Sequence, residues 1–180
     1  MKELETNRLK LRKLQASDAA AIFSNWASDP DVTRWLTWNP HDSVQVTEAV
    51  LAGWLREYED ARTYRWGIEE KETGTLTGMI DVVSWQDDFP VIGYVLGKAW
   101  WNRGYMTEAC RAVTDYLFAE GFEKILIEAD VRNSASREVI RKTGFIYDYS
   151  EKRVLSAAKP EEVTVNCYKM KSNLRRPADR

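Results

Sequence analysis

The segment from residue 91 to residue 120 constrains this chain more than any other. Val91-Ile92-Gly93-Tyr94-Val95-Leu96 reads as a strand, and from Tyr105 the apolar residues follow helical spacing. A short loop with the single glycine Gly104 precedes that helix. A strand that enters a helix through a tight loop aims several unpaired backbone N–H groups in one direction. Such a helix start carries roughly half a positive charge and binds phosphate oxygens, so the loop predicts an anionic, phosphate-bearing ligand.

The composition is that of one globular domain. The chain has 180 residues, 44% hydrophobic and 30% charged, with a net charge of −2. We expect a single domain over residues 1–172 and a polar C-terminal tail over 173–180. The charge balance argues against direct nucleic-acid binding, and the absence of an apolar run of ~20 residues argues against a membrane span. The N-terminus lacks the apolar region of a signal peptide, so we expect a cytoplasmic location.

Metal and thiol chemistry are not indicated by the sequence. The two cysteines, Cys110 and Cys167, form no CxxC pair, and His41 is the sole histidine. We therefore expect no metal site. Cys110 falls on the apolar side of the helix that follows Gly104, which favours a buried, inert thiol.

The remaining periodicity predicts a mixed layer of strands and helices. Strand patterns occur near residues 9–14, 64–68, 76–85, 91–96, 125–131, 146–154 and 163–170. Helical patterns begin at Ser17 or Asp18, near Asp42 or Ser43, at residue 105 and at residue 134, and the first should end at Asp29-Pro30. The order predicts a mixed α/β or α+β fold in which the helices pack on one large sheet.

Four motifs in this order resemble one family. They are Tyr94-Val95-Leu96, Trp101-Asn102-Arg103-Gly104-Tyr105-Met106-Thr107-Glu108-Ala109, Asn133-Ser134-Ala135-Ser136 and Lys142-Thr143-Gly144-Phe145. Together they resemble the GCN5-related N-acetyltransferases (GNAT). With Asn7–Arg12 they resemble more narrowly the RimJ/RimL-like branch, which acetylates the N-termini of ribosomal proteins. The resemblance implies one mixed, mostly antiparallel sheet of about seven strands, splayed centrally and flanked by about four helices, and acetyl-coenzyme A as the cofactor.

The resemblance also implies which residues bind that cofactor. They are Tyr94, Val95, Leu96, Asn102, Arg103, Gly104, Tyr105, Met106, Thr107, Asn133 and Ser136. The chain departs from the wider family at three places. Trp101 stands where the family has Gln or Arg, Met106 where it has Gly or Ala, and Ile140 where many members have a tyrosine that protonates the departing thiolate.

The implied acyl transfer needs a neutral amine. A protein α-amine, with a pKa near 8, is about one-tenth neutral at pH 7, so a carboxylate linked through water suffices as the base. By resemblance, Glu128 is the candidate base. The alternative is that Glu128 is an ordinary strand carboxylate, solvated or paired in a salt bridge. Asp130 is the second candidate for the base. Ser136 is the candidate donor to the thiolate sulfur, or else it bonds only to local backbone. Asn133 caps a helix or also contacts the pantetheine chain.

The acceptor is less constrained than the cofactor. Trp35 and Trp38 lie in a segment that borders the acceptor cleft in this family, and they form either its wall or a small satellite core. We expect the acceptor to be the N-terminal α-amine of a protein such as a ribosomal protein. A small amine (a polyamine, amino sugar or amino acid) is the alternative, which Asp87-Asp88 keeps open. A non-catalytic coenzyme A sensor is the third reading, and a homodimer is also left open.

Overall fold

A computed structural model describes residues 1–172 of the chain, and the expected tail at 173–180 lies outside them. The described chain forms one eight-stranded sheet in the order β1-β2-β3-β4-β5-β6-β8-β7. The strands are β1 (Leu4–Glu5), β2 (Leu9–Arg12), β3 (Arg65–Glu70), β4 (Thr75–Gln86), β5 (Phe89–Leu96), β6 (Lys124–Asp130), β7 (Ile146–Ser156) and β8 (Lys159–Lys171). The helices are α1 (Ala19–Ile22), α2 (Pro30–Thr33), α3 (Val44–Glu57), α4 (Tyr105–Ala119) and α5 (Ser134–Thr143).

The mixed, mostly antiparallel sheet expected from the sequence is confirmed. All seven expected strands are present, and every neighbouring pair is antiparallel except β5 with β6. The eighth strand is β1, whose two residues are too few to show a period. Within residues 1–172, no helix is both long and apolar enough to cross a membrane.

The first helical region differs from the prediction of one continuous helix. A 3₁₀ turn at Ala16–Asp18, α1 and a π-helical turn at Phe23–Ala27 follow one another. The π turn closes when the Ser28 N–H bonds to the Phe23 carbonyl at 3.1 Å. Asp29-Pro30 ends this region as expected, but it also begins α2, because the Asp29 side chain accepts from the Asp31 N–H at 2.8 Å.

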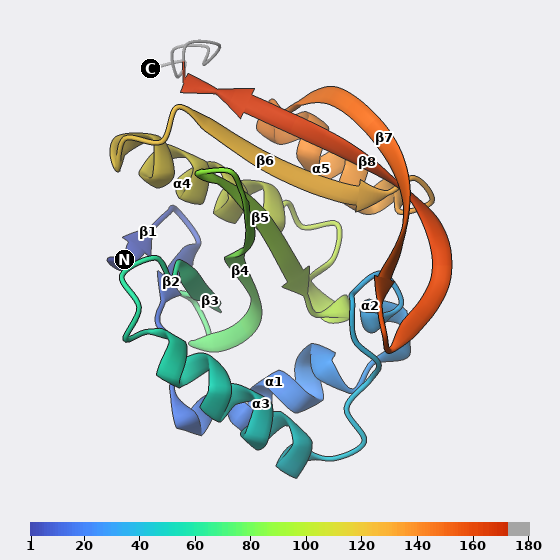
Figure 1. Cartoon of the computed structure of the whole chain (residues 1–180). Coiled ribbons are helices and arrows are strands. Elements are labelled where there is room, and N and C mark those ends of the chain that lie inside the picture. The colour runs from blue at the N-terminus through green and yellow to red at the C-terminus, as the bar shows by residue number, and fades with distance from the viewer. Residues whose placement is uncertain (173–180) are drawn as a thin grey trace.

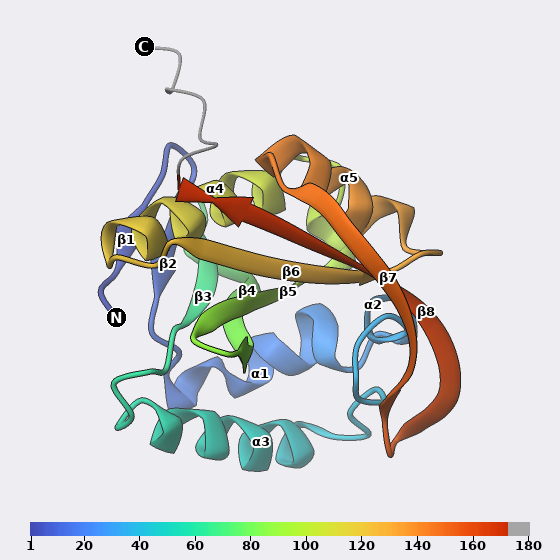
Figure 2. The same ribbon diagram turned by 45° about the horizontal axis from the view of Figure 1, so that its top comes forward.

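Two apolar cores lie on opposite faces of the sheet. Figure 2 shows α4 and α5 on one side of the sheet and α1 and α3 on the other. Met106, Cys110, Val113 and Leu117 of α4 enter the first core, and Ile22, Trp26 and Leu51 enter the second. The apolar residues that recur at helical spacing therefore form the helix faces that pack against the sheet.

The sheet splits between β5 and β6, as the expected central splay requires. These parallel strands pair only at Val91 with Leu126 and at Ile92 with Ile127. Beyond Ile92 the strands diverge, and Figure 1 shows β5 running away from β6 toward α2. Residues 93–96 of β5 therefore have no ladder partners on β6, and unpaired backbone groups of this kind require a ligand or water.

The long β7–β8 hairpin curves round the open end of this fork (Figure 1). Near its turn, Lys159 Nζ donates to the Thr33 carbonyl at 2.6 Å, and the Ser156 hydroxyl donates to the Thr37 carbonyl. Asn39 Nδ2 donates to the Ala158 carbonyl at 3.4 Å. The hairpin is thereby tied to the segment that carries Trp35 and Trp38.

Candidate active site

Helix α4 begins with its backbone N–H groups uncovered. Its N-cap is Gly104, which has a φ of +79° and no side chain to cap the first turn. In contrast, Ser43 caps α3 by accepting from the Val46 N–H, and Asn133 caps α5 by accepting from the Ser136 N–H. The free N–H groups of the first turn of α4 therefore suit the oxygens of a diphosphate. The loop residues Asn102 to Thr107 form this helix start, and their binding of the cofactor stays a prediction.

Trp101 and Met106, the two loop residues that depart from the family pattern, do not fill the predicted cradle. The Trp101 indole N–H donates to the Leu96 carbonyl at 2.7 Å, which fixes the loop to the end of β5. Met106 is buried in the core between α4 and the sheet, so its side chain points away from the cradle. Asn102 adopts a left-handed backbone with a φ of +61°, which lets the chain turn sharply before Gly104.

Arg8 lies beside the predicted cradle, and sequence reasoning missed it. Glu108, in the first turn of α4, would repel an anion, but Arg8 pairs with its carboxylate at 2.7 Å and the Thr6 hydroxyl donates to it at 2.6 Å. Arg8 also donates to the Arg103 carbonyl at 2.9 Å. A depression of about 570 Å³ beside the cradle is lined in part by Arg8, Gly104 and Thr107. The available signal was the basic residue in the Asn7–Arg12 motif.

A cavity of about 410 Å³ occupies the fork between β5 and β6. Several of the predicted site residues line it: Tyr94 and Val95 from β5, Glu128 and Asp130 from β6, Asn133 and Ser136 from α5, and the two tryptophans Trp35 and Trp38. The fork therefore joins the predicted thioester site to the predicted acceptor wall. Trp54 of α3 completes the aromatic lining.

Both carboxylates of β6 are paired with arginines. Arg153 of β7 donates to Glu128 through both terminal nitrogens and to Glu151 at 2.8 Å. Arg132 binds Asp130 at 2.6 Å, and its hydrogen bonds hold the pKa of Asp130 below the usual range. Asp130 is thus a poor proton acceptor. Glu128 is half-buried on the cavity wall and is also salt-bridged, which is the alternative that the sequence left open for it.

Cys167 adds a thiol to the group around Glu128. The ligand atoms of Glu128, Glu151 and Cys167 lie within 4.8 Å of one another. The Arg153 guanidinium pairs with both carboxylates, so the group is an ion-pair cluster. Burial raises the pKa of both thiols, that of Cys110 to about 12, and the expectation of a buried Cys110 is confirmed.

Ser136 has a hydroxyl partner inside the cavity. The hydroxyls of Tyr94 and Ser136 lie 2.9 Å apart, and Asn133 Oδ1 accepts from the Ser136 N–H at 3.1 Å. Asn133 is therefore a helix cap. Burial raises the pKa of Tyr94, so its hydroxyl stays protonated at neutral pH. Ile140, at the position of the family's tyrosine, is fully buried in the core between the sheet and α4.

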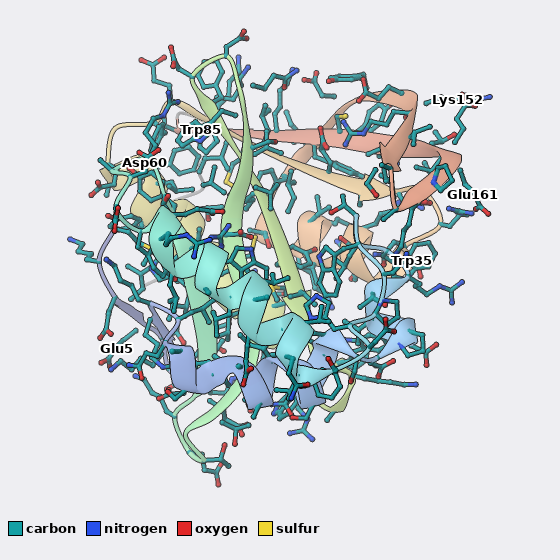
Figure 3. The ribbon with its side chains drawn as sticks, turned by 60° about the horizontal axis from the view of Figure 1, so that its bottom comes forward. Glu5, Trp35, Asp60, Trp85, Lys152 and Glu161 are labelled. Atoms are coloured by element: carbon teal, nitrogen blue, oxygen red, sulfur yellow. The ribbon has the colours of Figure 1, made fainter. Side chains whose placement is uncertain are left out.

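The tryptophan wall is held by the residues around it. Trp35 has the Arg34 guanidinium 4.6 Å from its ring centroid, and Figure 3 shows it on the side of the β7–β8 hairpin. Trp38 lies 5.0 Å from the His41 ring, and His41 Nδ1 is hydrogen-bonded to the Thr47 hydroxyl at 2.8 Å. Trp85 of β4 does not line the cavity and packs on Phe122. Asp87 and Asp88 are not among the residues that line the cavity, so they no longer argue for a polycation.

Sequence reasoning also missed an ion pair on the acceptor side. Arg65 Nε donates to Asp81 Oδ2 at 3.0 Å, and Arg65 Nη1 to Glu57 Oε2 at 2.7 Å. Both Arg65 and Asp81 line the cavity. Burial raises the pKa of Asp81 to about 6, although Arg65 opposes this rise. The available signal was a lone aspartate inside the apolar strand at residues 76–85.

Comparison with known proteins identifies the class of enzyme that this fold and site define. The family model of the acetyltransferase (GNAT) domain matches residues 8–146. The chain is 32% identical over 145 residues to the uncharacterized N-acetyltransferase YoaA of Bacillus subtilis, covering 79% of this chain and 81% of YoaA. The chain belongs to the GNAT family and is an N-acetyltransferase, and this family uses acetyl-coenzyme A.

Two solved structures share the fold. One is the acetyltransferase of Salmonella typhimurium that modifies the N-terminal serine of ribosomal protein L7/L12, with a TM-score of 0.79, 18% identity and coverage of 92% of this chain and 96% of that one. The other is the microcin C7 self-immunity acetyltransferase MccE in complex with acetyl-CoA and AMP, with a TM-score of 0.81, 13% identity and coverage of 92% and 93%.

Proposed function

We propose that the protein transfers an acetyl group from acetyl-coenzyme A to the N-terminal α-amine of a protein, such as a ribosomal protein. The fork between β5 and β6 carries this proposal, because its cavity has a carboxylate on its wall and β5 continues from it to the loop before the uncapped start of α4. The likeness to the Salmonella enzyme supports the choice of acceptor.

Acetyl-coenzyme A supplies the acetyl group as a thioester, and the chain supplies the groups around it. We assign the diphosphate to the backbone of residues 102–107 and the thioester end to the free edge of residues 94–96. A backbone N–H on that edge would polarise the thioester carbonyl. Asn133 and Ser136 would flank the pantetheine chain, since both line the fork.

Two side chains are proposed for proton transfer. Glu128 would accept a proton from the amine through water, because it lines the cavity while Arg153 holds its carboxylate. Ser136 would donate to the thiolate sulfur, and the protonated Tyr94 hydroxyl would support it. Trp35 and Trp38 would contact the first side chains of the acceptor.

Turnover on defined amines tests this assignment. Thiol release should occur with peptides that have a free N-terminus, and mass spectrometry should place the acetyl group on the α-amine. The matched control is the same peptide with a blocked N-terminus and a free lysine. Turnover on polyamines alone would exclude the N-terminal acceptor, and donor binding without turnover on any amine would favour the sensor.

A further inference from the structure

The sheet register places a second carboxylate opposite Glu128 across the fork. Arg65, Asp81 and Gly93 form one row across β3, β4 and β5. Gly93 is the first residue of β5 beyond its last pair with β6, and the same register continued would bring it to Glu128. Asp81 and Glu128 therefore flank the opening of the fork, and both line the cavity.

Gly93 leaves the β5 position between these carboxylates without a side chain, and Val83 of β4 packs against it. A Cβ added at Gly93 would lie 2.7 Å from a methyl carbon of Val83. Real Cβ atoms do not approach this closely, so the packing of Val83 favours glycine at this position. Between the two carboxylates the row therefore carries the Val83 side chain of β4 and no side chain of β5.

One oxygen of Asp81 is available to a ligand. Oδ2 accepts from Arg65, whereas no residue among 1–172 donates a hydrogen bond to Oδ1. Oδ1 is also not fully buried. In the described chain the single fully buried side-chain polar atom without a partner is Trp26 Nε1. The cavity-lining carboxylate is thus held by one oxygen and presents the other. This arrangement suits a proton acceptor.

We propose that Asp81 takes the first proton from the acceptor ammonium, before the amine attacks. The N–H bond breaks, its electron pair stays on nitrogen, and the proton bonds to Oδ1 of Asp81. A neutral amine and a neutral carboxyl group result, and the proton later passes to water. Glu128 then serves for the second proton, which is released as the N–C bond forms. This inference rests on the proposed function and adds a catalytic residue to it.

The electrostatic surroundings of Asp81 support this role. The groups that face it are Arg65 from β3, Glu57 from α3 and Tyr58, which follows α3, with Glu128 and Arg153 across the fork. Burial outweighs Arg65 and raises the pKa of Asp81 to about 6. Asp81 is therefore ionised at pH 7. Its affinity for a proton is about a hundredfold higher than that of an ordinary aspartate, and so lies closer to the proton affinity of an α-amine.

The test is the pH dependence of Asp81→Asn with two classes of amine. If the variant uses only amine that is already neutral, kcat/KM for an N-terminal peptide falls about tenfold at pH 7 and recovers to within about twofold at pH 9. For an alkylamine with a pKa near 10.4, kcat/KM at pH 7 falls by at most about two-thousandfold. A loss that is equal at both pH values or for both amines would overturn the proposal.

Two further measurements separate this role from other causes. Asp88→Asn, an exposed aspartate in the β4–β5 turn, is the matched control and should leave the profile unchanged. In the wild-type protein without donor, carboxyl-carbon NMR should show Asp81 titrating near pH 6; a midpoint near 4 would contradict the proposal even if the variant fails to fold. Wild-type protein that acetylates no amine would instead refute the proposed function.

Discussion

Replacing Asp81 by asparagine should stabilise the fold while it lowers activity. The folded protein binds the Asp81 proton more tightly than the unfolded chain, because burial raises the pKa from 3.8 to about 6. Stability therefore falls as pH rises through this window, and the cost stays constant above it. A shift of about two pKa units corresponds to at most about 3 kcal/mol of the free energy of unfolding. Asparagine has nearly the shape of the protonated acid and avoids this cost.

The opposing effect is the loss of one partner of a buried ion pair. Such a loss typically costs about 3–5 kcal/mol, because the other charge is stranded. Arg65 is not stranded here, since Glu57 still pairs with it at 2.7 Å and its guanidinium lies 5.2 Å from the centroid of a Trp54 ring. The asparagine oxygen can also accept from Arg65 Nε. We therefore expect a net gain of about 1–3 kcal/mol at pH 7.5.

Urea unfolding followed by tryptophan fluorescence measures this difference at pH 7.5 and at pH 5. The gain should fall to about half at pH 5, where Asp81 is already mostly protonated in the folded protein. Asp88→Asn should show no gain at either pH. A variant that loses several kcal/mol at pH 7.5 would refute the reasoning and make the pair with Arg65 a structural ion pair, and a gain independent of pH would refute its electrostatic origin.

Three other substitutions test the rest of the site. Gly104→Val should abolish binding of coenzyme A in calorimetry and cost about 1–2 kcal/mol of stability, because a branched residue would have to adopt a φ of +79°; unchanged affinity would contradict the cradle. Glu128→Gln should lower kcat by about 10²-fold with unchanged donor affinity, and a wild-type pH–rate profile would remove Glu128 from the mechanism. Tyr94→Phe should lower kcat about tenfold without changing the KM for the donor, the effect of one neutral hydrogen bond to Ser136, and it should add little to Ser136→Ala.

The elements with strong periodicity were predictable from the sequence. Helix α4 was expected at 105–120 and runs over Tyr105–Ala119, because its apolar residues recur at helical spacing and Gly104 sets its start. Ser43 and Asn133 begin α3 and α5 as expected, since both side chains accept from first-turn N–H groups. The π turn at Phe23–Ala27 was not predictable, because its apolar spacing is nearly that of an α-helix.

The candidate site was predictable where a residue belongs to a local motif. Gly104, Asn133 and Ser136 could be found because each stands at a fixed distance from a helix start. Arg65 and Asp81 could not, because their pairing depends on the register of β3 with β4. The pairing of Glu128 with Arg153 likewise depends on how β6, β8 and β7 lie side by side.

The opening of the fork coincides with an irregularity in β4. The register of β4 with β5 shifts between Val82 and Ser84, so Val83 is an extra residue and its side chain lies over Gly93. A bulge increases the twist of the strand pair that contains it. Since Gly93 is the residue at which β5 loses β6, the extra twist and the loss of pairing coincide. The irregularity therefore places the Val83 side chain over Gly93, beside the row of Asp81, at the point where the fork opens.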